Sequence, residues 1–185
     1  MKIRPAEPDD ALPIAKVIID TFYATYPGPA SKQGLDEFKQ SIYPESAARW
    51  RQRIEDIASG AAPRSCIYVA EDEGGVVGIS YACPSKDESA PDGVGELDML
   101  YIRESHQRQG IGTALVGITA EHLARLDVTT LHICTPTDHT QGRRFYEKLG
   151  GIVVATREDY EDGEIIPLVV YEWTDLAALV QNSPR

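Results

Sequence analysis

The sequence LDMLYIRESHQRQGIGTALV, residues 97–116, changes along its length from a strand pattern to a helix pattern. LDMLYI is mostly apolar, TALV continues a helix, and the junction QRQGIG (107–112) contains two glycines. A glycine-rich turn at a helix N-terminus presents several backbone N–H groups to one point, where the helix dipole adds partial positive charge. The stretch therefore predicts an anion site, most often one for phosphate.

Other glycine motifs do not fit this junction. A P-loop requires a lysine after its last glycine, and a dinucleotide-binding turn requires three glycines spaced G-x-G-x-x-G in an early βαβ unit. Here two glycines lie late in the chain, and no lysine follows them. On spacing alone, a turn in which glycine only relieves crowding remains an open alternative.

Length and composition favour one domain spanning residues 1–185. The chain has 185 residues, and its 42% apolar content is ordinary for a globular protein. No apolar run is long enough to cross a membrane, and the N-terminus lacks a signal-peptide pattern. The three cysteines show no paired spacing, which predicts reduced thiols, no metal site and a cytoplasmic location.

The formal net charge of -11 limits the expected partners. An acidic chain is a poor ligand for nucleic acid or for an anionic membrane surface, so neither is expected. The same charge is compatible with a cationic substrate such as an amine.

Hydrophobic periodicity and turn residues give an element order of β, α, α, β, β, β, α, β, α, β, β, followed by a tail that may be helical. This order predicts one α/β domain around a mixed sheet. We expect the second helical region, residues 35–58, to be interrupted at Pro44. The expected elements span residues 1–7, 8–26, 35–58, 65–72, 75–84, 94–103, 110–126, 128–135, 139–151, 152–160 and 164–174.

Two motifs at a fixed separation resemble the GNAT superfamily of N-acetyltransferases. QRQGIG fits that family's Q/R-x-x-G-x-G/A signature, and RRFYEKLGG (143–151) resembles its second hallmark, a helix with an aromatic pair. The resemblance, to a small bacterial-type member, covers nearly the whole chain in element order. It implies a mostly antiparallel sheet that splays at a cofactor site, with helices on both faces.

The resemblance also implies acetyl-CoA as co-substrate. Its pyrophosphate would lie on the turn, and its pantetheine arm would pair with the end of the preceding strand, although simple core packing also explains the apolar residues there. His139 stands where many members carry an asparagine near the arm, but it could equally be a plain helix-start residue. The implied contacts are Leu100, Tyr101, Ile102, Gln107, Arg108, Gln109, Gly110, Ile111, Gly112, Thr113 and His139.

For catalysis, the resemblance places Tyr146 near the coenzyme sulfur as general acid. Glu96 matches a catalytic glutamate of some relatives and is the leading candidate for general base. Strand alternation puts Glu96 and Asp98 on one face, and Leu97 and Met99 on the other. Asp98 is a second candidate, and both acids could instead sit in a solvated mouth that attracts a cationic amine.

The implied reaction is transfer of an acetyl group to a primary amine of a small, cationic molecule by direct attack. Alternatives are a protein N-terminus or lysine as acceptor, or a non-catalytic acyl-CoA-binding module. A homodimer is possible, since relatives are frequently dimeric. Cys134 could suggest an acyl-enzyme nucleophile but is more simply a small buried residue. Candidate residues for the acceptor slot are Tyr23, Tyr26, Tyr160, Glu161 and Asp162.

Overall fold

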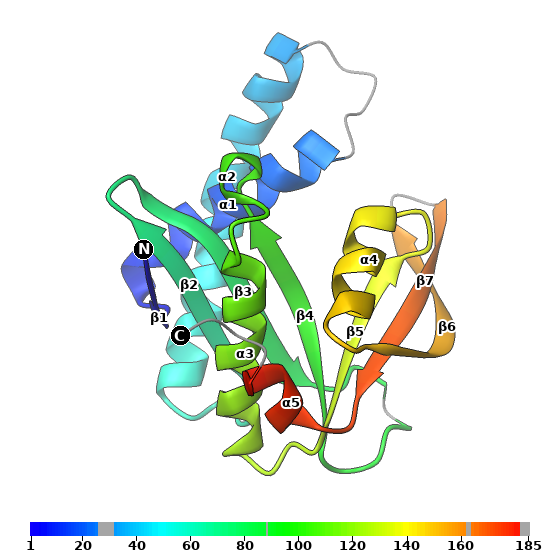
Figure 1. Cartoon of the computed structure of the whole chain (residues 1–185). Coiled ribbons are helices and arrows are strands. Elements are labelled where there is room, and N and C mark those ends of the chain that lie inside the picture. The colour runs from blue at the N-terminus through cyan, green and yellow to red at the C-terminus, as the bar shows by residue number, and fades with distance from the viewer. Residues whose placement is uncertain (26–31, 88, 162–163, 182–185) are drawn as a thin grey trace.

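The structure is a computed structural model that describes residues 1–25, 32–87, 89–161 and 164–181. Its helices and strands follow the predicted order along the chain (Figure 1). The strands are β1 (Lys2–Pro5), β2 (Cys66–Asp72), β3 (Gly75–Pro84), β4 (Val94–Ile102), β5 (Thr130–Pro136), β6 (Ile152–Glu161) and β7 (Glu164–Trp173). The helices are α1 (Ala11–Thr25), α2 (Lys32–Ala58), α3 (Ile111–Ala124), α4 (Thr140–Lys148) and α5 (Leu176–Gln181), with short 3-10 turns η1 (Pro8–Asp10) and η2 (Glu104–His106).

The strands of this part of the chain form one sheet in the order β1-β2-β3-β4-β5-β7-β6. Every neighbouring pair is antiparallel except β4 and β5, which are parallel. The parallel pair requires a crossover, and α3 supplies it. The predicted α/β class with a mixed, mostly antiparallel sheet is therefore confirmed.

Helices cover both faces of the sheet, as expected (Figure 1). One apolar cluster joins α3, α4 and α5 to one face, and a second joins α1 and α2 to the opposite face of β2 and β3. The first contains Leu115, Leu131 and Tyr171, and the second contains Ile14 and Ile79, all essentially inaccessible to solvent. No helix among the described residues has the length and apolar character needed to cross a bilayer.

The sheet separates between β4 and β5. These strands pair only over Val94–Glu96, opposite residues 130–132. Beyond Glu96, β5 keeps β7 as its neighbour and β4 keeps β3, so residues 97–102 present one backbone edge to no described strand. The predicted splay is therefore present, and Figure 1 shows the two strands diverging.

The predicted interruption at Pro44 is wrong, because α2 runs continuously through it. A proline inside a helix removes one hydrogen bond, here the one that would end on the carbonyl of Gln40. Both residues are exposed, so water can bind that carbonyl. The neighbouring Tyr43 and Trp50 are buried against the α1 side of the core, and this packing maintains the helix.

The predicted alternation along β4 fails at Met99. A bulge shifts the register between β3 and β4, so that Leu97 is opposite Ala82 while Met99 is opposite Tyr81. Leu97 packs in the α3-side cluster, but Met99 packs against the cluster of α1 and α2. The extra residue at the bulge is Asp98, and the local change in direction follows from its insertion.

A buried hydrogen bond connects the sheet to α3. The hydroxyl groups of Ser80 on β3 and Thr119 on α3 lie 2.8 Å apart, and both residues are fully inaccessible to solvent. Removing one partner leaves the other hydroxyl buried without a hydrogen bond, which is more costly than removing both.

We therefore expect Thr119→Val to lower the free energy of unfolding by about 1–3 kcal/mol. Adding Ser80→Ala should restore part of that loss, because no unpaired hydroxyl then remains. Urea unfolding of the two single variants and the double variant measures the coupling. Strictly additive losses would show that the two hydroxyl groups do not stabilise each other in the folded protein.

Candidate active site

A cleft of about 1440 Å³ opens where β4 and β5 diverge. Its walls come from α1, the β4 edge, the start of α3, α4 and the strands β5 to β7. Two predicted cofactor contacts, Gln109 and Ile111, are absent from its described lining. The other predicted site residues do line it: Glu96, Leu100, Tyr101, Ile102, Gln107, Arg108, Gly110, Gly112, Thr113, His139 and Tyr146.

The two exceptions have other surroundings. Ile111 is 2% exposed and packs in the α3-side core. The exposed Gln109 donates a hydrogen bond from Nε2 to the carbonyl of Ser105 at 3.1 Å. The side chains of these two residues therefore do not face the cleft. Only their backbone groups, which belong to the turn around Gly110, remain as candidate contacts to a ligand.

The turn before α3 has an unusual backbone. Gly110, the N-cap of α3, has φ of +85°, and Arg108 has φ of +59°. The first hydrogen bond into the helix runs from the Ala114 N–H to the Gly110 carbonyl at 3.0 Å. The first turn of an α-helix points its backbone N–H groups outward at the N-terminus, and no acidic side chain lies in the first turn of α3. Both features suit an anion.

The second glycine has a different role. A Cβ atom on Gly112 would lie 3.1 Å from Ile102 Cδ1 and 3.2 Å from Phe145 Cζ. Gly112 thus lets α3 approach β4 and α4 closely, so the crowding explanation applies to this position. Gly110 instead satisfies a left-handed backbone angle that glycine adopts at little cost.

Charges in the cleft are separated. The lining near α3 and α4 carries Arg108, Arg144 and Lys148. The described carboxylates of the lining lie on the strands β4 and β6: Glu96, Asp98, Glu158 and Asp159. The lining cations Lys86 and Arg157 each contact one of these carboxylates. Gln107 bridges the cationic end, donating to the Ile102 carbonyl at 3.0 Å and accepting from the Gln141 amide at 3.2 Å.

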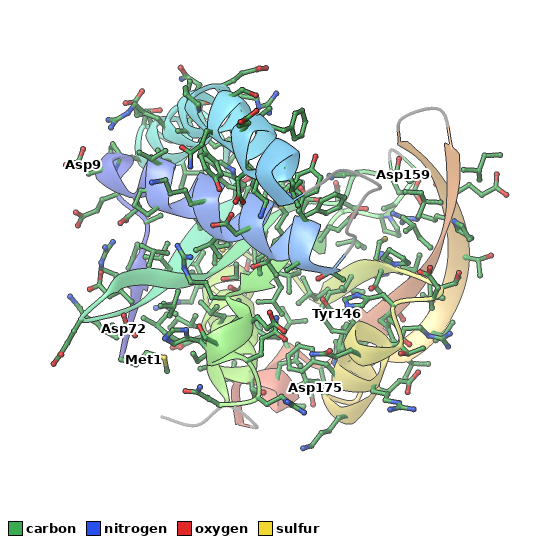
Figure 2. The ribbon with its side chains drawn as sticks, turned by 90° about the horizontal axis from the view of Figure 1, so that it is seen from above. Met1, Asp9, Asp72, Tyr146, Asp159 and Asp175 are labelled. Atoms are coloured by element: carbon green, nitrogen blue, oxygen red, sulfur yellow. The ribbon has the colours of Figure 1, made fainter. Side chains whose placement is uncertain are left out.

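Tyr146 on α4 also lines the cleft. Seen from above, Figure 2 places it between α3 and the layer formed by α4, β6 and β7. Its ring packs against Tyr171 and Trp173, at centroid distances of 5.8 and 6.2 Å. Burial raises the pKa of the phenol, and the nearby Tyr101 and Cys134 add to this effect. The hydroxyl therefore stays protonated at neutral pH and can donate a hydrogen bond.

Glu96 is 4% exposed and lies where β4 and β5 part. Its Oε2 accepts the Lys86 backbone N–H at 3.3 Å and lies 3.6 Å from Arg157 Nη1. Asp98 is 2.5 Å from Lys86 Nζ. Glu96 and Asp98 thus both contact Lys86, and the Lys86 ammonium group binds the Asp98 carboxylate.

The sequence did not predict that Lys86, Cys134 and Arg157 line the cleft beside the two acids. Arg157 Nη1 also lies 3.7 Å from Cys134 Sγ. Burial raises the pKa of the Cys134 thiol to about 11, and the adjacent Glu96 contributes. The thiol is therefore protonated at neutral pH, which argues against a nucleophilic role. No short sequence motif could have identified Arg157 as a residue of the cleft, because the pairing register of β6 and β7 determines its position.

His139 lines the cleft, whereas none of the predicted acceptor residues is among its described lining residues. His139 is the N-cap of α4, and its Nδ1 lies 3.3 Å from Thr135 Oγ1. Tyr23 packs edge-to-face on Phe38 and is not among the described lining residues. Tyr26 and Asp162 lie outside the described residues, as do the side chains of Tyr160 and Glu161.

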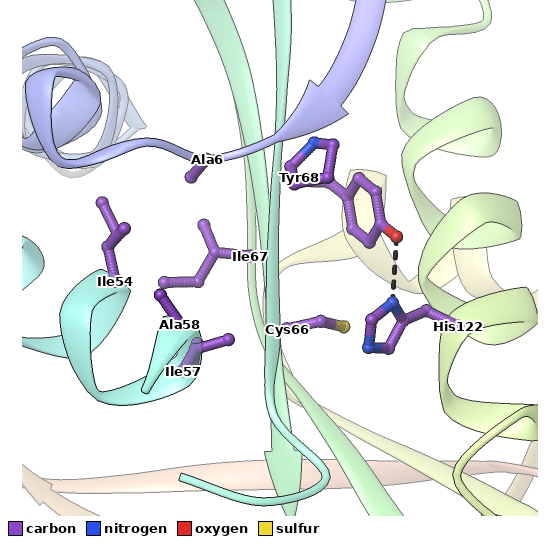
Figure 3. Close-up of a pocket in the computed structure, with 9 residues that line it drawn as sticks. Ala6, Ile54, Ile57, Ala58, Cys66, Ile67, Tyr68 and His122 are labelled. Atoms are coloured by element: carbon purple, nitrogen blue, oxygen red, sulfur yellow. Dashed lines mark hydrogen bonds between the residues drawn. The ribbon is translucent and has the colours of Figure 1, made fainter. Parts of the chain in front are cut away.

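A separate cavity of about 170 Å³ lies between α2, β2 and α3, and shares no lining residue with the cleft. Its wall is mostly apolar. The one hydrogen bond drawn in Figure 3 joins the Tyr68 hydroxyl to His122 Nδ1 at 3.0 Å. Burial lowers the pKa of His122, which favours the neutral ring. The chemistry-bearing residues are therefore concentrated in the large cleft.

Comparison with known proteins agrees with this geometry. Residues 63–150 match the family model described as an acetyltransferase (GNAT) domain. The chain is 28% identical to the uncharacterized N-acetyltransferase YuaI of Bacillus subtilis, covering 96% of this chain and 95% of that protein.

Solved structures share the fold. PaiA N-acetyltransferase from Thermoplasma acidophilum, solved in complex with coenzyme A, has a TM-score of 0.69 at 17% identity, with 94% and 98% of the two chains covered. YncA from Salmonella typhimurium, a putative acetyltransferase solved with its cofactor acetyl-CoA, has a TM-score of 0.62 at 18% identity, with 94% and 92% covered. The splayed sheet and the glycine turn agree with the match of residues 63–150 to this family model and with the similarity to an N-acetyltransferase, which together support membership of the GNAT superfamily of acetyltransferases.

Proposed function

We propose that this protein transfers an acetyl group from acetyl-CoA to a primary amine of a small molecule by direct attack. The observation that carries the proposal is the edge of β4 that pairs with no described strand beyond Glu96 and is followed, after η2, by the turn at Gly110. An extended chain with amide groups can add to such an edge as a further strand does. A phosphate at its end would then reach the start of α3.

The residues of the cleft fit acetyl-CoA along its length. Pantetheine carries two amides that suit the backbone groups of residues 97–102. The pyrophosphate suits the helix N-terminus, and Arg108, Arg144 and Lys148 suit its negative charge. When bound, acetyl-CoA supplies an activated acetyl group on a thioester. Relatives solved with coenzyme A or acetyl-CoA support this assignment.

In the reaction, a C–N bond forms between the amine and the acetyl carbon while the C–S bond breaks. The attacking amine must be neutral and loses a proton as the bond forms. Glu96 lies beside the end of the free edge and can accept that proton, directly or through water. Asp98 is a weaker candidate, because Lys86 Nζ already binds its carboxylate.

Tyr146 serves the departing sulfur. Its pKa lies above the ordinary phenol value of about 10, whereas an ordinary thiol has a pKa of about 8.5. Complete proton transfer from the phenol to the thiolate is therefore uphill. We propose that Tyr146 stabilises the sulfur mainly by donating a hydrogen bond as negative charge develops.

Thiol release from acetyl-CoA across polyamines, amino acids, aminoglycosides and peptides tests the proposal. We expect turnover with small amines. Turnover with peptides alone would favour a protein amine as acceptor. Coenzyme binding without turnover on any acceptor would favour the non-catalytic module and contradict the proposal. The homodimer stays a prediction.

Replacing Tyr146 by Phe should lower kcat by about 100-fold, because one hydrogen-bond donor to the developing charge is lost. The affinity for acetyl-CoA should change little. Tyr171→Phe is the matched control, since its hydroxyl binds Glu147 at 2.9 Å and is not among the residues lining the cleft. Steady-state kinetics of both variants make the comparison. Equal turnover in wild type and Tyr146→Phe would remove Tyr146 from the mechanism.

The pH dependence of kcat/KM should reflect the protonation states of the acceptor amine and of the Tyr146 phenol. For an alkylamine acceptor with a pKa of about 10.4, kcat/KM should rise with pH from 6 to 9 as the amine loses its proton. Because burial raises the pKa of Tyr146, the phenol stays protonated throughout that range. Loss of the donor should therefore not lower activity below about pH 10. A descending limb below pH 9 that disappears in Tyr146→Phe would contradict this assignment.

A further inference from the structure

We propose that the acceptor carries an anionic group close to its amine, as an α-amino acid does, and that Arg157 binds this group. The inference rests on the proposed function and names its substrate class. It replaces the expected simple cationic amine with a zwitterion. The feature that carries it is an arginine in the cleft whose described contacts are all long.

The Arg157 side chain reaches across the sheet towards β4. It lies on β6 opposite Leu168 of β7, yet its guanidinium contacts groups on two strands further in and on the loop after β3. Nη1 is 3.7 Å from Cys134 Sγ on β5 and 3.6 Å from Glu96 Oε2 on β4, and Nη2 is 3.4 Å from Asp87 Oδ2. The side chain is 27% exposed and lines the cleft. A ligand beside Glu96 is therefore within reach of Arg157.

The hydrogen-bonding capacity of Arg157 is poorly used by these contacts. A guanidinium has five N–H donors arranged for bidentate binding of a carboxylate. Arg4 shows the saturated case, with four contacts of 2.6–3.0 Å to Asp10 and Glu71. No described contact of Arg157 is shorter than 3.4 Å. Two carboxylates hold the cation in place without forming the short bidentate pair that a ligand carboxylate could form.

Electrostatics discriminates between acceptors. An ammonium group beside Glu96 would also lie near the Arg157 guanidinium, 3.6 Å from the same carboxylate. Repulsion between an ammonium group and this guanidinium disfavours an acceptor that carries only positive charge. An anionic group next to the amine offsets this repulsion and can form the short bidentate pair that Glu96 and Asp87 do not form with Arg157. The short Glu96–Arg157 distance requires the two charges of the acceptor to be close together.

The remaining wall suits an apolar substituent. Phe22 of α1 and Ile166 and Leu168 of β7 line the same cleft. Leu168 is the cross-strand neighbour of Arg157, so apolar surface lies beside the cation. An amino acid with an aliphatic side chain fits this combination better than a polyamine does.

Matched acceptors test the proposal. Thiol release from acetyl-CoA is measured with leucine, with its amide leucinamide and with 3-methylbutylamine, the amine that lacks the carboxylate. The same three-member set is then measured for each other amino acid whose amide and decarboxylated amine exist. Calorimetry measures binding of leucine and 3-methylbutylamine in the presence of coenzyme A. We expect the carboxylate-bearing member of the preferred set to exceed its decarboxylated partner at least 30-fold in kcat/KM, mainly through KM.

Arg157→Gln should remove that preference. It should lower kcat/KM for the amino acid about 30-fold or more and leave the decarboxylated amine equal or improved, because repulsion is relieved. Arg157→Lys should restore part of the preference. Arg49→Gln is the control, since Arg49 lies on exposed α2 surface and pairs only with Glu45 in the described contacts. Thermal unfolding establishes that each variant is folded.

Four outcomes would overturn the inference. Equal or better turnover of decarboxylated amines by the wild type would show that no anionic group is recognised. An equal loss on both acceptors in Arg157→Gln would show that Arg157 only positions Glu96. Turnover restricted to polyamines or peptides would refute the zwitterion while the acetyltransferase proposal stands. Failure to acetylate any amine would refute both.

Discussion

The separation of β4 from β5 after Glu96 is the constraint on which the rest of the site depends. Backbone N–H and C=O groups normally require partners when they are removed from water. Here the sheet gives up that pairing along residues 97–102, so an extended ligand can supply it. The same separation places Glu96 at the point of divergence and opens the cleft that Glu96 and Tyr146 of α4 both line. One change in strand pairing therefore prepares the binding edge and brings both candidate catalytic groups to it.

Charge then divides the cleft into two parts. Arg108, Arg144 and Lys148 lie at the end formed by α3 and α4, whereas the lining carboxylates lie on β4 and β6. This distribution is independent of the overall charge of -11, which by itself indicated only a cationic partner. Among these carboxylates, Lys86 and Arg157 add two positive charges. The acceptor site is therefore mixed in charge, and a zwitterion complements it better than a cation alone.

Much of this arrangement could be predicted from the sequence, because it depends on local features. The glycine turn, the strand before it and the Tyr146 helix each leave a recognisable short pattern, and their separation indicated the fold. The details that were missed depend on contacts between distant segments. Pro44 is tolerated because Tyr43 and Trp50 pack beneath the helix, and Met99 changes face because of a bulge set by β3. Arg157 reaches Glu96 only after β5, β7 and β6 are assembled.

A crystal structure of this protein with coenzyme A tests the central claim most directly. The account predicts pantetheine amides hydrogen-bonded to the free edge of β4, within residues 97–102. It also predicts the pyrophosphate at the backbone amides before and within the first turn of α3, and the sulfur within hydrogen-bond reach of the Tyr146 hydroxyl. Coenzyme bound elsewhere, or bound with β4 and β5 closed against each other and Tyr146 remote from the sulfur, would contradict it.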